Sequence, residues 1–196
     1  ADEIAVGFGR TGTLFACEQA GITPDFLLLG KGLTGGYLPL SVCLTTDNVY
    51  QAFYAEYTAQ KAFLHSHSYT GNPLACAAAN ATLDIFRDDD VLNRNRQLAA
   101  HMARATAHFA EHAHVAEVRQ RGMILAIEMV RDKKTRAPYP WQERRGLAVY
   151  RHGLENGALL RPLSNVVYFM PPYVITEAEI DQLAKVAWEG IERATR

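Results

Sequence analysis

The sequence predicts an α/β protein, with part of a parallel-sheet lobe in residues 1–89 and a small α+β lobe in residues 90–196. Three observations predict this class. Short continuous apolar runs at 26–29 and 40–44 are typical of strands that are covered on both faces. An alanine-rich pattern at 72–86 has a proline near its start and apolar residues at helical spacing. Segments that alternate like antiparallel strands appear only in the second half of the chain.

The second half begins with a predicted helix at 91–112, which carries apolar residues on one side and arginines on the other. Alternating segments at 115–119 and 123–130 then predict two antiparallel strands joined at Gly122. The polar stretch 131–140 contains two prolines and is predicted to be a loop.

The last third predicts a helix at 141–156 that ends at Gly157, because glycine is the residue that most often follows a helix. Two further strands are predicted at 158–161 and 166–170. The final helix starts at a capping box, Thr176 to Glu179. Its inward face is predicted to carry Ile180, Leu183, Val186, Ala187 and Ile191.

Composition limits the class of partner. The 196 residues are 48% hydrophobic and 21% charged, as in globular proteins. Lys and Arg number 20 against 21 acidic residues, so the formal net charge of -1 argues against nucleic acid as a partner. No apolar run approaches the roughly 18 residues that span a bilayer, so no membrane partner is expected. The three cysteines form no CxxC pair, which favours buried thiols and a cytoplasmic location.

Two glycine motifs resemble nucleotide-binding loops but lack the required context. Residues 7–12 read GxGxxG, yet only three apolar residues precede them and the next acidic candidate, Asp25, comes too early for a dinucleotide site. Residues 30–32 read Gly-Lys-Gly, and glycine follows the lysine where a Walker A loop needs serine or threonine. Such crowding of glycines still indicates close approach of the backbone to another group.

Lys31 follows an apolar strand, at the edge where α/β sheets present groups to ligands. A lone lysine is usually a solvated surface charge. In apolar surroundings, however, the pKa of an amine falls and the amine becomes a nucleophile toward carbonyls. Asp2 lies at the end of another presumed strand, where an N-cap or a surface carboxylate is the simpler interpretation.

The remaining candidates are separate polar residues. His65 and His67 could bind a metal, but no further ligands are spaced to complete a tetrahedral site, so none is expected. The serines beside them, before a helix, could instead hold phosphate oxygens. Arg161 could clamp a carboxylate, although an exposed arginine at a rim explains it equally well. Tyr168 alone is more often a core residue.

Taken in order, segments 2–12, 24–25, 30–36 and 69–75 resemble the class III pyridoxal-phosphate aminotransferases of fold type I. The resemblance covers the whole chain. Further segments are most similar to the branch of that class that moves an amino group from S-adenosylmethionine to 8-amino-7-oxononanoate: residues 65–68, 76–80, 161–162 and 168–173.

The resemblance implies a role for each charged residue near the cofactor, pyridoxal 5'-phosphate. Asp2 pairs with the pyridine nitrogen, and Lys31 binds the cofactor aldehyde and later carries a proton. Ser66 falls where the family binds substrate, and His67 and Ser68 fall where it binds the cofactor phosphate across a homodimer interface. A common variant of the motif has glycine, proline and threonine at these three positions. Ser68 keeps a hydroxyl, so two donors to the phosphate stay open, this hydroxyl or a backbone amide.

Three further residues match substrate positions of the family. Arg161 matches the clamp for the keto-acid carboxylate, Tyr168 lies where substrates are selected, and Arg10 matches a motif residue that contacts substrate. The family chain is about twice as long and carries other cofactor contacts upstream, so we expect a fragment with half of the active site. Two alternatives remain: a class III enzyme for ornithine or 4-aminobutyrate, and a truncated, non-catalytic relative.

Overall fold

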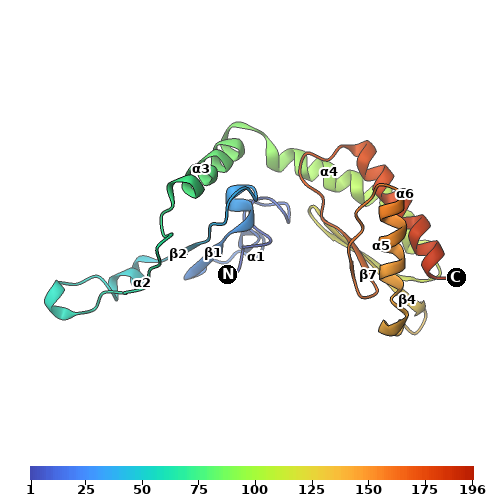
Figure 1. Cartoon of the computed structure of the whole chain (residues 1–196), viewed down its shortest axis with the longest axis horizontal. Coiled ribbons are helices and arrows are strands. Elements are labelled where there is room, and N and C mark those ends of the chain that lie inside the picture. The colour runs from blue at the N-terminus through green and yellow to red at the C-terminus, as the bar shows by residue number, and fades with distance from the viewer. The chain divides into compact units, whose positions relative to one another are not determined.

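The computed structural model describes all residues, 1–196, and divides the chain into two compact units, Ala1–Leu92 and Asn93–Arg196 (Figure 1). The boundary expected from the sequence, between residues 89 and 90, lies close to this division. Each unit has its own cluster of buried apolar side chains. None of the helices combines the length and the apolar composition needed to cross a membrane.

The first unit contains two strands, β1 (Phe26–Leu29) and β2 (Val42–Thr45), which pair antiparallel with Leu29 opposite Val42. The sequence predicted parallel strands, and within this chain parallel pairing is limited to one bridge between Asp2 and Leu28. The reason lies in the link between the strands. It holds one 3₁₀ turn, η1 (Lys31–Thr34), instead of the helical crossover that two parallel neighbours need.

Helix α3 (Pro73–Asp88) supports the strand end where Lys31 lies. Asn72 caps it as its Oδ1 accepts the N–H groups of Leu74 and Ala75 at 2.9 and 3.3 Å, and Pro73 takes the first helical position as predicted. Its buried Ala79 joins Phe8, Leu29 and Leu33 in a small core. Three short helical segments of this unit, of three to five residues, were not predicted because they are too short to show periodicity: α1 (Cys17–Ala20), α2 (Asp47–Gln51) and η2 (Tyr57–Ala59).

The second unit is built on an antiparallel sheet in the order β3-β4-β7-β6, with β5 paired to the far end of β4. The strands are β3 (Val115–Arg121), β4 (Ile124–Asp132), β5 (Ala137–Pro138), β6 (Pro162–Leu163) and β7 (Val166–Phe169). Gly122, with φ of 55°, makes the predicted turn between β3 and β4. The stretch predicted to be a loop therefore contains a short strand, β5.

The strand predicted at 158–161 is wrong. Ala158 donates its N–H to the carbonyl of Gly153 at 2.8 Å, so its backbone closes the end of helix α5 (Arg145–Glu155) instead of joining the sheet. Gly157 has φ of 73°, as expected for the residue after a helix. Strand β6 instead starts at Pro162, one residue after the end of the predicted strand, and Pro162 pairs with Val167.

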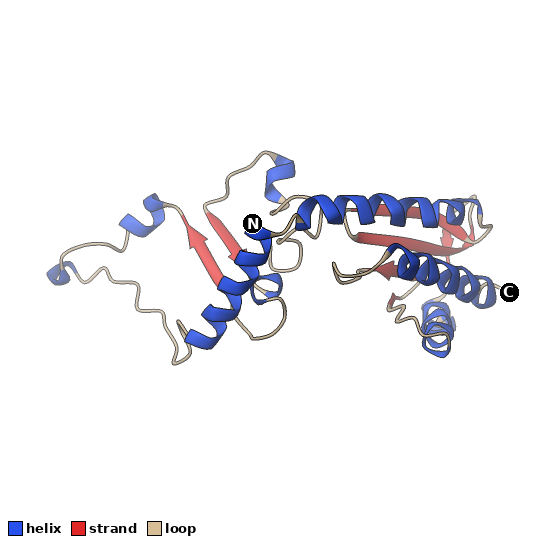
Figure 2. Cartoon of the chain, turned by 90° about the horizontal axis from the view of Figure 1, so that it is seen from above, coloured by secondary structure: helices blue, strands red, loops and turns tan.

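The remaining helices cover one face of the sheet, and Figure 2 shows the long ones running beside its strands. Helix α4 (Val91–Thr106) ends earlier than predicted and tightens into η3 (Ala107–Glu111), while η4 (Trp141–Glu143) precedes α5. Helix α6 (Glu177–Ala194) has the predicted capping box, since Thr176 and Glu179 each accept the other's backbone N–H. Alternate sheet residues, such as Ile127 and Phe169, are buried beneath these helices.

Candidate active site

Asp2 lies in an extended segment that is fixed beside β1. Leu28 donates its N–H to the carbonyl of Ala1 at 2.9 Å, and Glu3 donates its N–H to the carbonyl of Leu28 at 3.0 Å. The Asp2 side chain is exposed, and its Oδ1 accepts the N–H of Ile4 at 3.0 Å. Because only one oxygen is engaged, the carboxylate has a fixed direction and a second oxygen for a ligand.

Lys31 is separated from the end of β1 by Gly30 and is the first residue of η1. It is exposed and has φ of 34°, in the left-handed region that a side chain rarely adopts. A backbone held in this region costs about 1–3 kcal/mol and is found most often at functional sites. The apolar surroundings that would activate its amine are not supplied by this chain, because the side chain is exposed.

The glycines on both sides of Lys31 are explained by close packing. A Cβ atom at Gly32 would lie 3.0 Å from the Cβ and Cδ2 atoms of Phe8, and one at Gly30 would lie 3.2 Å from Cγ2 of Ile4. The segment that begins with Asp2 therefore packs directly on the backbone that carries Lys31. The close backbone approach that the glycine pattern indicates is, at Gly30 and Gly32, packing against the side chains of Ile4 and Phe8.

Arg10 lies half-buried in a run of turns that includes the GxGxxG motif. Neither a preceding strand nor a directly following helix frames that motif, so the dinucleotide context is absent in the structure as well. Gly9 and Gly12 have φ of 87° and 107°, which explains glycine at both positions.

Ser66, His67 and Ser68 lie in an exposed segment that precedes α3. The His67 backbone N–H donates to Oγ1 of Thr70, and its ring Nδ1 accepts the N–H of Tyr69, both at 3.3 Å. No hydrogen bond or ion pair joins this segment to Asp2 or Lys31. The structure therefore does not bring these residues together with the Asp2 and Lys31 pair.

Arg161 and Tyr168 are neighbours across the hairpin of β6 and β7 in the second unit. Pro162 of β6 is opposite Val167 of β7. Tyr168 is the next residue along β7, and Arg161 directly precedes β6, so the alternation of an extended chain would place both side chains on one face. The turn between the strands falls at Ser164, with φ of 53°, and Asn165, as predicted. That face is the one turned away from the helices, and Tyr168 is half-buried on it while Arg161 is exposed.

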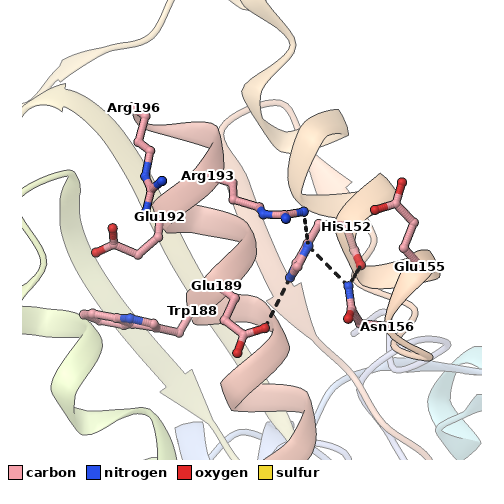
Figure 3. Close-up of a pocket in the computed structure, with 8 residues that line it drawn as sticks. All are labelled: His152, Glu155, Asn156, Trp188, Glu189, Glu192, Arg193 and Arg196. Carbon is pink, nitrogen blue, oxygen red and sulfur yellow. Dashed lines mark hydrogen bonds and ion pairs between the residues drawn. The ribbon is translucent and has the colours of Figure 1, made fainter.

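A cavity of about 580 Å³ lies between α5 and α6 and is lined by none of the residues predicted to form the site (Figure 3). The ring of His152 crosses it: Nδ1 accepts N–H groups of Arg193 and Asn156 at 3.1 and 3.3 Å, and Nε2 lies 3.5 Å from Oε2 of Glu189. Nδ1 of this ring is thus hydrogen-bonded, whereas Nε2 is buried and has no hydrogen-bond partner. Elsewhere, no group of three or more His, Cys, Asp or Glu side chains is placed to hold a metal ion.

One residue near the site was missed by sequence reasoning. Glu3 is 2% exposed, although it directly follows the exposed Asp2. Its Oε2 and Oε1 accept the N–H groups of Ala16 and Cys17 at 2.9 and 2.7 Å, which satisfies donors at the start of α1. The signal that could have found it is the alternation of an extended chain, which sends neighbouring side chains to opposite faces.

Comparison with known families decides the assignment. The family described as aminotransferase class III matches residues 1–189. The chain belongs to the class III aminotransferases. It is 47% identical over 194 residues to the adenosylmethionine-8-amino-7-oxononanoate aminotransferase of Geobacter sulfurreducens, and the match covers 99% of this chain and 42% of that protein.

Solved structures agree with this family. The crystal structure of adenosylmethionine-8-amino-7-oxononanoate aminotransferase from Methanocaldococcus jannaschii has a TM-score of 0.94 at 43% identity, covering 99% of this chain and 45% of that one. The omega transaminase from Pseudomonas jessenii in complex with PMP has a TM-score of 0.93 at 30% identity, covering 100% and 43%. These similarities confirm the predicted α/β class and fold type I. The chain spans less than half the length of these class III relatives.

Proposed function

We propose that this chain supplies the lysine and aspartate of the active site in a pyridoxal-phosphate-dependent aminotransferase. The observation that carries the proposal is the bridge between Asp2 and Leu28 on β1, the strand whose end carries Lys31. One short element thus holds a carboxylate and a primary amine. The similarity to class III relatives supports the same two roles.

The residues present fit the cofactor. One oxygen of Asp2 is free to accept the N–H of a pyridine ring, and the amine of Lys31 is accessible to an aldehyde. When bound, pyridoxal phosphate supplies an electron-withdrawing ring that stabilises negative charge at the substrate carbon. Asp2 keeps that ring nitrogen protonated, and Lys31 moves the proton at the substrate carbon as general acid and base.

We propose S-adenosylmethionine as the amine donor and 8-amino-7-oxononanoate as the acceptor, giving 7,8-diaminononanoate for biotin biosynthesis. Relatives that carry this name support the choice. Arg161 would bind the keto-acid carboxylate through its planar fork, and Tyr168, beside it on the same sheet face, would contact the donor. Arg10 is proposed as a third substrate contact.

We further propose that two copies of the chain pair to complete each site. The segment that carries Ser66, His67 and Ser68 belongs to a stretch with many exposed apolar side chains, and such patches mark interaction surfaces. In a homodimer, these three residues would reach the cofactor phosphate or the substrate of the partner's site. The stretch includes Tyr50, Tyr54, Tyr57, Phe63, Leu64 and Tyr69, whose exposed fractions are 51%, 67%, 92%, 65%, 94% and 76%.

The test of the proposed function is replacement of Lys31 in the full-length protein. Lys31→Ala should abolish transamination while the protein still binds cofactor, and Lys31→Arg should fail equally because a guanidinium stays protonated. Lys134→Ala, which removes an exposed lysine outside the proposed site and outside the proposed dimer surface, is the control and should keep the parent rate. Turnover by Lys31→Ala near the parent rate would contradict the role proposed for Lys31.

A further inference from the structure

Glu3 is a buried carboxylate for which the proposed chemistry has no direct use. At 2% exposure it is one of the few buried charged side chains in the structure. It accepts two backbone N–H groups, from Ala16 at 2.9 Å and Cys17 at 2.7 Å. Burying a charge is unfavourable unless it is well hydrogen-bonded, so this arrangement needs a structural or functional reason.

The backbone of Glu3 is fixed as firmly as its side chain. Its N–H donates to the carbonyl of Leu28 at 3.0 Å, and its carbonyl accepts the N–H of Gly7 at 2.9 Å. A Cβ at Gly7 would lie only 2.8 Å from that carbonyl oxygen, so glycine is required for this contact. Glu3 thus ties together β1, the turn after Asp2, and the start of α1.

These contacts hold Asp2 from its C-terminal side. Because consecutive residues of an extended chain point to opposite faces, anchoring Glu3 toward α1 turns Asp2 outward, where its side chain is exposed. The same backbone pairing ties Asp2 to β1 and therefore to Lys31. A change at Glu3 would alter the direction of the Asp2 carboxylate without removing any group that touches a ligand.

We infer that Glu3 is a positioning residue of the aminotransferase site, which sets the direction of the Asp2 carboxylate toward the pyridine nitrogen. This inference rests on the proposed function. A small misplacement of a catalytic group can lower a rate as much as about a hundredfold. Glu3 should therefore influence the protonation of the ring, and not only the stability of the fold.

The experiment uses the full-length holoenzyme reconstituted with pyridoxal phosphate labelled with ¹⁵N at the ring. Three variants are compared with the parent: Glu3→Gln, Asp2→Asn and Glu18→Gln. Glu18 is the matched control, because its Oε1 also accepts a backbone N–H, that of Phe15 at 2.7 Å, but the side chain is exposed. Ring protonation is read from the ¹⁵N chemical shift over pH, and kcat from transamination.

Glu3→Gln should lower kcat by roughly 10- to 100-fold. It should also move the ring ¹⁵N shift toward that of Asp2→Asn, while Glu18→Gln matches the parent. A folded Glu3→Gln holoenzyme with the parent's kcat and ¹⁵N titration would overturn the inference. If Glu3→Gln does not fold, Ala16→Pro decides in the same way. This variant removes the Ala16 N–H, one of the two backbone groups that donate to the Glu3 carboxylate, and the φ of -66° at Ala16 suits proline.

Failure of the proposed function would look different. A parent holoenzyme with no transamination, or with an unprotonated ring nitrogen, would remove the role of Asp2 and the inference with it. A parent holoenzyme that is active and has a protonated ring nitrogen, together with a Glu3→Gln variant whose kcat and ¹⁵N titration match the parent, would contradict this inference alone.

Discussion

At the scale of single residues, adjacent carboxylates take different roles because of where the extended chain points them. Asp2 is exposed and keeps one oxygen for a ligand, whereas Glu3 is buried against the start of α1. Sequence reasoning identified Asp2 and Lys31 as candidates. It missed Glu3, because its carboxylate binds the backbone N–H groups of Ala16 and Cys17, more than ten residues away. Backbone donors do not depend on residue type, so the sequence does not indicate them.

Arg161 and Tyr168 give a prediction at the same scale. Arg161→Ala should weaken binding of the keto acid by about 1.5–3 kcal/mol, the range for hydrogen bonds to charged groups. Tyr168→Phe, which keeps the ring and removes the hydroxyl, should slow the half-reaction with the donor more than that with the acceptor. Single-turnover absorbance of the cofactor measures both. Unchanged keto-acid affinity in Arg161→Ala would exclude the clamp, and equal losses in Tyr168→Phe would make Tyr168 a packing residue.

At the scale of elements, caps and turns were predicted better than strand ends. The helix start marked by Pro73 and the capping box of Thr176 and Glu179 depend on residues close together in the sequence, so the sequence displays them directly. The strand predicted at 158–161 failed because Ala158 hydrogen-bonds back to Gly153, and an apolar pattern cannot distinguish that closure from a sheet. The sequence pattern also did not predict the antiparallel pairing of β1 with β2, because that pairing depends on how the segment between them, which contains η1, folds.

The contact of α6 with the end of η3 predicts a dependence on pH. His112 is buried beside Trp188, with Nε2 3.2 Å from Oε1 of Glu192 and Nδ1 accepting the N–H of His114 at 3.0 Å. Burial lowers the pKa of His112, outweighing the opposite effect of Glu192, and the neighbouring His114 and Lys133 lower it further. The neutral ring, with its proton on Nε2, therefore satisfies both nitrogens.

Because this pKa is lowered on folding, the unfolded chain binds the proton first as the pH falls. The free energy of unfolding should therefore decrease below about pH 6.5, by about 1.4 kcal/mol for each unit of pKa difference, down to the folded pKa. His112→Gln, which can still donate and accept, should show a smaller decrease. Urea unfolding followed by tryptophan fluorescence at pH 7.5 and 5.5 measures it. An equal decrease in parent and variant would assign the effect to other groups.

At the scale of the whole molecule, the residues assigned to one active site are divided between two compact units. Asp2, Arg10, Lys31 and the segment of Ser66 to Ser68 belong to the first, and Arg161 and Tyr168 to the second. The order of motifs along the chain was sufficient to recognise the class, because the match to the family extends over residues 1–189. How the parts combine depends on contacts between units and copies, which local sequence patterns do not encode.

The central claim is that this chain belongs to an enzyme that takes its amino group from S-adenosylmethionine. The most direct measurement is a single-turnover experiment on the full-length holoenzyme, mixed separately with S-adenosylmethionine, ornithine or 4-aminobutyrate, while the visible absorbance of the cofactor is followed. We expect S-adenosylmethionine alone to discharge that absorbance rapidly and 8-amino-7-oxononanoate to restore it. A rapid change with ornithine or 4-aminobutyrate and none with S-adenosylmethionine, or no change with any amine, would contradict the claim.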